Sequence, residues 1–351
     1  MEIFQPVAES YAAFALEAVD SPCFRDWATS VAGDAEVQQL IATLPAIKQQ
    51  ANLVFAAARW HGVPAPGPYD ALRAALLDDW DTIRGTVLAR STQTNEVGRL
   101  ATLVPVFVGL DGPLALIEVG ASAGLCLYPD RWGYAWTFPD GHTVTAGTEP
   151  RLACEVTGEP PLPVAPPEVA WRAGIDLHPL DVTDPDAMAW LQVLVWPEQV
   201  ARRDRLAAAI EVARAEPPYL REGDLLDTLP ALLDEVPAGT APVVFHSAVI
   251  AYLETPDRDR FHDLMTGLVA EGRCVWVSNE GPRVLPEVAA TGPQPGPGPL
   301  FVLGIDGRAV AHAHGHGRTL DWLPPRGCNA VSTSLSAPHA RHSASRAPRY
   351  S

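Results

Sequence analysis

The stretch Leu114-Ala-Leu-Ile-Glu-Val-Gly-Ala-Ser-Ala-Gly124 decides the fold of this 351-residue chain. Its first six residues are apolar apart from Glu118, and the run ends at Gly120, which is typical of a buried parallel strand. Small residues at Gly120, Ser122 and Gly124 let backbone amides approach a ligand at the start of a helix. The spacing departs from G-x-G-x-x-G, because Ser122 holds the middle position and Gly124 comes one place early. The stretch therefore predicts either a ligand-binding turn or a tightly packed one.

Short apolar runs alternate with helical patterns from residue 111 to residue 324. This alternation predicts right-handed crossovers and a doubly wound, mostly parallel sheet. Strands are expected at 114–119, 169–176, a short run ending near 223, 242–245 and 274–277, followed by a hairpin at 300–305 and 308–314. The aromatic and Pro-rich segment 128–168 predicts an inserted β-hairpin or lid between the first two strands.

Residues 1–110 carry helical patterns throughout. Ser21 and Asp34 predict helix starts, long helices are expected at 46–61 and 69–88, and Thr94 is expected to cap a helix that ends near residue 109. The tail 325–351 is rich in Ser, Ala, Pro and Arg, which predicts disorder. The expected organisation is a helical region at 1–110, an α/β domain at 111–324 and a basic tail.

The charge distribution argues against two classes of partner. The formal net charge is −17, and the tail holds four arginines and no acid, so residues 1–324 carry −21. An acidic body repels nucleic-acid phosphates and anionic membranes. We therefore expect a small-molecule substrate, and neither a nucleic-acid nor a membrane partner. No oligomeric state is predicted.

The start of the chain and the cysteines predict a cytoplasmic protein. The N-terminal residues lack the basic start and apolar run of a signal peptide, and the longest uncharged apolar stretch, at 241–253, is too short to span a bilayer. The five cysteines are scattered and never form C-x-x-C, which excludes a disulfide framework and a zinc cluster.

Two further strand ends carry an acid. Asp176 ends the second expected strand, where a doubly wound fold presents a carboxylate to ribose hydroxyls. Asp224 follows Gly223 at the end of the third. The alternative for each is a solvated Asp that caps the next helix.

Together these strand ends and the terminal hairpin resemble class I S-adenosylmethionine-dependent methyltransferases over about residues 110–323. The resemblance implies a Rossmann-like sheet and S-adenosylmethionine as cofactor, with Asp176 at the ribose. Because Asp176 lies 58 residues after Glu118, the insertion must loop out for this to hold. The resemblance further implies a cofactor site formed by Glu118, Gly120, Ser122 and Gly124 along the loop, Asp224 and Leu225 at adenine, and Ser247.

Motifs over almost the whole chain are similar to an uncharacterised bacterial family, domain of unknown function 2332. These motifs are 92–96, 118–125, 174–176 with 179–182, and 245–249. This resemblance implies a Rossmann-like fold and brings no established activity, and the tail after about Pro325 lies outside it.

Candidate catalytic residues follow the fourth and fifth strands. Methyl transfer is an in-line displacement that needs a general base only for some nucleophiles. His246 and Glu280 are the candidates for that role, and their alternative is a hydrogen-bonded position at a strand end. Thr94, Asn95 and Glu96 form either a helix start or the rim of the substrate and cofactor site.

The triplet His312-x-His314-x-His316 places imidazoles on one face of a strand, where they could share a metal. No acid or cysteine completes the set by spacing, so no metal is predicted. The sequence thus predicts an α/β, Rossmann-like S-adenosylmethionine-dependent methyltransferase acting on an unidentified small molecule. A non-catalytic cofactor-binding or protein-interaction module on the same fold is the alternative, and the glycine spacing disfavours a dehydrogenase.

Overall fold

Eleven strands form one mostly parallel sheet within the residues that the computed structural model describes, which are 6–93, 95–296, 298 and 300–324. The strand order is β3-β2-β4-β11-β10-β9-β8-β7-β1-β5-β6. The strands are β1 (Leu114–Val119), β2 (Gly133–Thr137), β3 (Thr143–Ala146), β4 (Arg151–Thr157), β5 (Val169–Asp176), β6 (Tyr219–Glu222), β7 (Ala241–Ser247), β8 (Val275–Glu280), β9 (Leu300–Ile305), β10 (Arg308–His314) and β11 (Thr319–Trp322).

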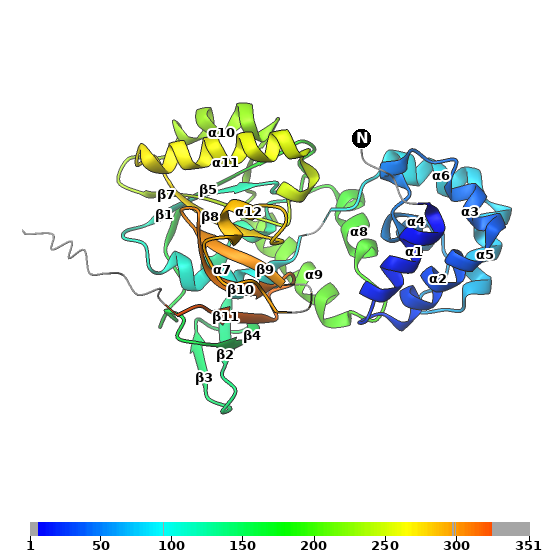
Figure 1. The fold of residues 1–351 in the computed structure, drawn as a ribbon, viewed down its shortest axis with the longest axis horizontal. Helices are drawn as coiled ribbons and strands as arrows, with labels where there is room; N and C mark the ends of the chain where they lie inside the picture. The colour runs from blue at the N-terminus through cyan, green and yellow to red at the C-terminus, as the bar shows by residue number, and fades with distance from the viewer. Residues whose placement is uncertain (1–5, 94, 297, 299, 325–351) are drawn as a thin grey trace, which may run out of the picture.

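The described part of the chain also forms twelve α-helices. Figure 1 shows α10 and α11 over one face of the sheet, and α7 on the other. The helices are α1 (Val7–Glu17), α2 (Pro22–Gly33), α3 (Ala35–Ile41), α4 (Ala51–Trp60), α5 (Tyr69–Asp78), α6 (Trp80–Ala89), α7 (Leu100–Phe107), α8 (Pro185–Leu194), α9 (Val200–Ala215), α10 (Leu225–Leu233), α11 (Thr255–Ala270) and α12 (Pro286–Ala289).

Strand β1 is the centre of the parallel region, with β5 on one side and β7 on the other. All six of its residues are buried, because helices cover both faces of a parallel sheet. Leu114 and Leu116 belong to the core that faces α7, whereas Ile117 and Val119 belong to the core under α10 and α11. The strands predicted at 114–119 and 169–176 and the hairpin are confirmed.

The two early helix caps are confirmed. The Phe24 amide donates to Ser21 Oγ at 3.1 Å, and Asp34 Oδ1 accepts amide hydrogens at the start of α3. The long helices predicted at 46–61 and 69–88 are wrong in their continuity. A 3₁₀ turn at Ala46–Lys48 precedes α4, and the second segment is divided at Asp79, whose φ is −134°. Apolar periodicity continues across such breaks and does not reveal them.

Helices α8 and α9, from the crossover between β5 and β6, lie against the N-terminal helices (Figure 1). Arg59 Nη1 on α4 donates to the carbonyl oxygens of Val193 and Val195, at 2.6 and 2.7 Å. The rings of Trp60 and Trp190 meet edge to face at 5.9 Å. The helical layer is therefore built from two distant parts of the chain, and its core is continuous with that of the sheet.

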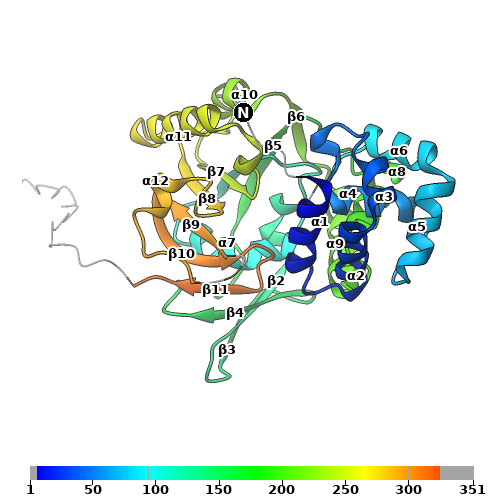
Figure 2. The same ribbon diagram turned by 45° about the vertical axis from the view of Figure 1, so that its right-hand side comes forward.

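The segment 128–168, for which a β-hairpin or a lid is predicted, contains the antiparallel hairpin β2–β3 and is not a lid. Its strands β2, β3 and β4 extend the main sheet, because β4 pairs in parallel with β11 (Figure 2). The aromatic residues explain this placement: Trp136 is buried, stacks on Tyr134 at 5.3 Å and donates from Nε1 to Ala101 O on α7 at 2.7 Å.

Two further features concern the tail and the length of the helices. The disordered tail was predicted at 325–351, which lies outside the described residues. Among the helices of the described chain, none combines the length and apolar character needed to cross a membrane.

Candidate functional site

The strand order reverses between β1 and β7, at the carboxyl edge of the sheet. The chain leaves β1 towards β5 and β6 on one side, then returns to β7 and β8 on the other. Ligands of open α/β sheets bind where the order reverses in this way. Ser122 after β1 and Ala248 after β7 both have positive φ, at 52° and 58°. Such strained positions gather at functional sites, which makes this edge the first place to examine.

The loop after β1 is held by two residues predicted for the site. The Ser122 amide donates to Asp176 Oδ2 at 2.8 Å, and the His178 amide donates to Asp176 Oδ1 at 2.8 Å. Asn95 contacts the same loop, because its Nδ2 donates to Ser122 Oγ at 2.9 Å and its Oδ1 accepts from the Ala123 amide at 3.2 Å. The structure thus brings Asn95, Ser122 and Asp176 together.

The glycines of this loop serve close packing. A Cβ on Gly120 would lie 2.0 Å from the side chain of Val249, in the loop after β7. A Cβ on Gly124 would lie 2.9 Å from Pro218, next to β6. Both glycines also have positive φ. Of the two sequence interpretations of this turn, tight packing is therefore directly observed, and ligand binding stays a prediction.

Glu118 lies beneath this loop on the face of the sheet that carries Leu116. It is 8% exposed, and its Oε2 has no hydrogen-bond partner among the described residues. Burial raises the pKa of the Glu118 carboxyl well above its usual range, against the opposing effect of Arg99. Arg99 is itself buried and donates to the carbonyl oxygens of Ser247 and Gly315. Glu118 thus has a buried oxygen atom, Oε2, that could form a further hydrogen bond.

His246 and Glu280 form a buried pair on the opposite face of the sheet. His246 Nδ1 lies 2.8 Å from Glu280 Oε1, and its Nε2 accepts from Trp276 Nε1 at 3.0 Å. Glu280 Oε1 also accepts from the amides of Val249 and Ile250. Both ring nitrogens are therefore occupied, and the pair fixes the loop after β7. A role in catalysis stays a prediction for both residues.

Three other predicted residues occupy positions of different kinds. Ser247 Oγ accepts from Asn279 Nδ2 at 2.9 Å at the carboxyl edge. Asp224 is exposed and caps α10 through the Leu226 amide at 2.8 Å, which is the alternative considered for it. Leu225 packs partly buried on the core under α10.

Glu96 turns away from Asn95 and into a charged cluster. It is 1% exposed, and its Oε1 caps the 3₁₀ turn Val97–Arg99 through the Gly98 amide at 3.1 Å. It forms ion pairs with Arg202 Nε at 2.6 Å and Arg205 Nη2 at 3.4 Å. The helix start predicted at 94–109 is therefore capped by Glu96. Thr94 lies outside the described residues.

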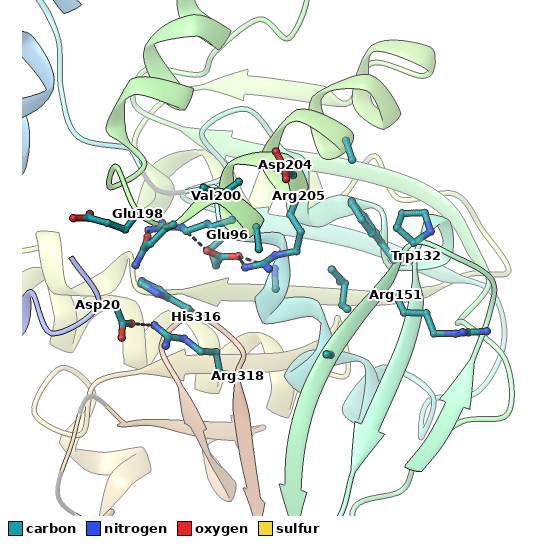
Figure 3. Close-up of a pocket in the computed structure, with 18 residues that line it drawn as sticks. Asp20, Glu96, Trp132, Arg151, Glu198, Val200, Asp204, Arg205, His316 and Arg318 are labelled. Carbon is teal, nitrogen blue, oxygen red and sulfur yellow. Dashed lines mark hydrogen bonds and ion pairs between the residues drawn. The ribbon is translucent and has the colours of Figure 1, made fainter. Parts of the chain in front are cut away.

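Two cavities lie between the helices and the sheet, and Arg202 and His316 line both. The smaller, about 360 Å³, is bounded by Asn95 and Tyr252 at the carboxyl edge. The larger, about 700 Å³, contains Glu96 and Trp132 in its wall (Figure 3). Burial and the neighbouring arginines lower the pKa of His316 to about 2, so its ring is neutral at physiological pH.

Most of the residues that line these cavities carry no recognisable motif. Arg202 and Arg205 are examples, although arginines at 202, 203 and 205 form a visible cluster in an acidic chain. His316 was considered only as a metal ligand. Strand β10 ends at His314, and His316 follows in the turn, so the alternation expected for a strand stops there. Within the described residues, no group of three metal-ligating side chains comes together.

A family model described as an uncharacterised protein conserved in bacteria, DUF2332, matches residues 8–322. No curated protein matches the chain.

Proposed function

The chain belongs to the bacterial family DUF2332, and from the geometry of its carboxyl edge we propose that it is an S-adenosylmethionine-dependent methyltransferase acting on a small molecule. One observation carries the proposal. The five strands β6-β5-β1-β7-β8 are parallel, and β1 lies at their centre. The chain goes from β1 to β5 and β6 on one side and then to β7 and β8 on the other, so the strand order reverses directly beside the glycine loop. A Rossmann-like sheet of this order binds its ligands there.

The smaller cavity supports this location. Asn95 lines it and bonds to Ser122 of the loop after β1, and Tyr252 lines it from the segment after β7. A volume of about 360 Å³ falls within the range of small-molecule sites. Because Val249 fills the space in front of Gly120, the cofactor would reach the edge from the helical side, past Asn95.

The residues present fit such a cofactor in two respects. Each oxygen of the Asp176 carboxylate accepts one amide hydrogen and retains a further lone pair for a ribose hydroxyl. The unpartnered Oε2 of Glu118 offers a second polar group under the loop. The bound cofactor would supply an electrophilic methyl group, and the chain would hold the acceptor in line with it.

Titration calorimetry tests the proposal with S-adenosylmethionine, S-adenosylhomocysteine and, as the control ligand, NAD. We expect heat from the first two and none from NAD. Replacing Asp176 by Asn should weaken S-adenosylmethionine binding by about tenfold, the effect of losing a hydrogen bond to a charged group. Asp263→Asn, at an exposed position on α11, is the matched control and should bind as the original protein does.

The alternative of a non-catalytic module has one observation in its favour, which is the side chain of Val249 against Gly120. If neither sulfonium nor thioether ligand binds, the glycine loop is a packing device and the methyltransferase proposal fails. Unchanged affinity in Asp176→Asn would overturn the ribose assignment alone.

A further inference from the structure

The larger cavity has the size and lining of a ligand site. Its volume of about 700 Å³ lies within the range found for small-molecule sites. Trp132 and Leu152 contribute apolar surface on the side of the strands, and α9 contributes Val200 and the arginines on the other side. Figure 3 shows Glu96 joined to these arginines, and Trp132 on the side of the strands.

Three buried polar atoms of this wall lack a hydrogen-bond partner among the described residues: the acceptor Glu96 Oε2, which is held by the ion pair with Arg202, and two donors. Trp132 is 3% exposed, and its Nε1 is buried with no acceptor among the described residues. Arg205 Nε is likewise buried and without an acceptor in the described chain. A buried donor without a partner costs about 1–3 kcal/mol, so a ligand that supplies acceptors would be stabilised here.

The carboxylates in the wall of the cavity do not accept hydrogen bonds from these two donors. Both oxygens of Glu198 accept from the start of α2, at Ser21 Oγ and the Cys23 amide. Asp20 is paired with Arg318, and Asp204 is exposed. Glu96 is engaged by Arg202 and Arg205, so none of these acids accepts from Trp132 Nε1 or Arg205 Nε.

The first turn of α9 also favours a negatively charged ligand. Val200 and Ala201 line the cavity, and the preceding Gln199 makes no side-chain cap for the helix. The amides of Val200 and Arg202 donate to backbone oxygens of the preceding turn, whereas no acceptor is found for the Ala201 amide in the described chain, and such an amide at the start of a helix favours a negative group. His316, kept neutral by burial and by the arginines, adds no competing charge.

From these contacts we propose that the larger cavity binds a small organic acid, with its carboxylate at Arg205 and Trp132 Nε1 and its apolar body against Leu152 and Val200. The identification of this acid as the methyl acceptor rests on the proposed function. Binding of the acid itself does not, so it is measured without S-adenosylmethionine.

Ligand-observed NMR and calorimetry with benzoate and indole-3-acetate test the proposal, and benzamide serves as an uncharged control of the same shape as benzoate. We expect both acids to bind and benzamide to bind at least tenfold more weakly. Arg205→Gln should weaken the acids about tenfold, whereas Arg260→Gln, on the exposed surface of α11, should leave their affinity unchanged.

Trp132→Phe separates binding from folding. The indole nitrogen has no partner in the described protein, so this change should leave the urea midpoint unaltered or slightly higher while acid binding falls about fivefold to tenfold. Equal binding of benzoate and benzamide, no binding by either acid, or full affinity in both variants would each overturn the proposal. If the protein binds the acids but not S-adenosylmethionine, the proposal of an acid site stands and only the methyltransferase proposal fails.

Discussion

Glu118 has a stability cost that depends on pH. Its raised pKa means that the folded state holds the proton more tightly than the unfolded state, whose carboxyl titrates near 4.5. The contribution of Glu118 to the free energy of unfolding is therefore most favourable below pH 4.5, and it declines as the pH rises above that value. We predict that Glu118→Gln raises the free energy of unfolding at pH 8 by about 1 kcal/mol and has little effect at pH 4.

Urea denaturation at the two pH values measures this difference, with Glu254→Gln at an exposed position as the control. A gain of the same size at both pH values would contradict the assignment. In the proposed function the same substitution should weaken S-adenosylmethionine binding, since it changes the polar group under the loop.

His316 should show the opposite dependence on pH. Its folded pKa of about 2 lies below the ordinary value of 6.5, so the unfolded state binds the proton first as the pH falls. Stability is therefore unaffected above pH 6.5 and is lost below it, by up to about 1.4 kcal/mol per pH unit. His316→Asn should flatten the decline in melting temperature between pH 6.5 and 5, and parallel curves for the two proteins would refute this.

Local motifs predict part of the site. Asp176 and Ser122 are predicted from strand ends, Asn95 is predicted as either a helix start or the rim of the site, and the three residues meet at the glycine loop. Arg202 and Arg205 contact Glu96 across more than a hundred residues, because α9 belongs to a crossover whose direction no local pattern encodes. The contact between His246 and Glu280 could not be predicted from local sequence either, because it depends on β7 and β8 being neighbours in the sheet.

Among the elements, the loops after β1 and β7 are coupled by one close contact. Gly120→Ala would combine the cost of positive φ with a clash against Val249, and we predict a loss of about 2–4 kcal/mol. Gly112 also has positive φ but faces open space, so Gly112→Ala should lose only about 1 kcal/mol.

Chemical denaturation of the two variants gives these values, and a double variant tests the cause. Adding Val249→Ala to Gly120→Ala should recover part of the loss, because the smaller side chain makes room for the new methyl group. Strictly additive effects would show that the two loops are not coupled.

The strands of the parallel region and of the terminal hairpin are predictable from the sequence, and β11 is not. The run 114–119 is buried on both faces, which leaves a clear signal in the sequence. Strand β11 has only four residues and includes the exposed Asp321, so no strand was expected there. Its parallel pairing with β4 joins the inserted strands, predicted only as a β-hairpin or a lid, to the main sheet.

At the scale of the whole molecule, the N-terminal helices share one core with a face of the sheet. The same apolar cluster runs from Val7 on α1 to Leu320 on β11. We predict that helical and tertiary signals, followed by far- and near-ultraviolet circular dichroism, disappear in a single urea transition. A separate early loss of helix, or a fragment 1–110 that folds independently, would contradict this continuity.

The pairing of β4 with β11 also sets an order on the ribosome. Strands β2 to β4 leave the exit tunnel long before Thr319–Trp322, the segment that connects them to the remaining strands. At about 5–20 residues per second this delay lasts on the order of ten seconds, during which β4 has an open edge on that side. Nascent chains arrested before Thr319 should therefore be cleaved readily by protease around 133–157, and chains arrested far enough beyond Trp322 for it to have emerged should be protected.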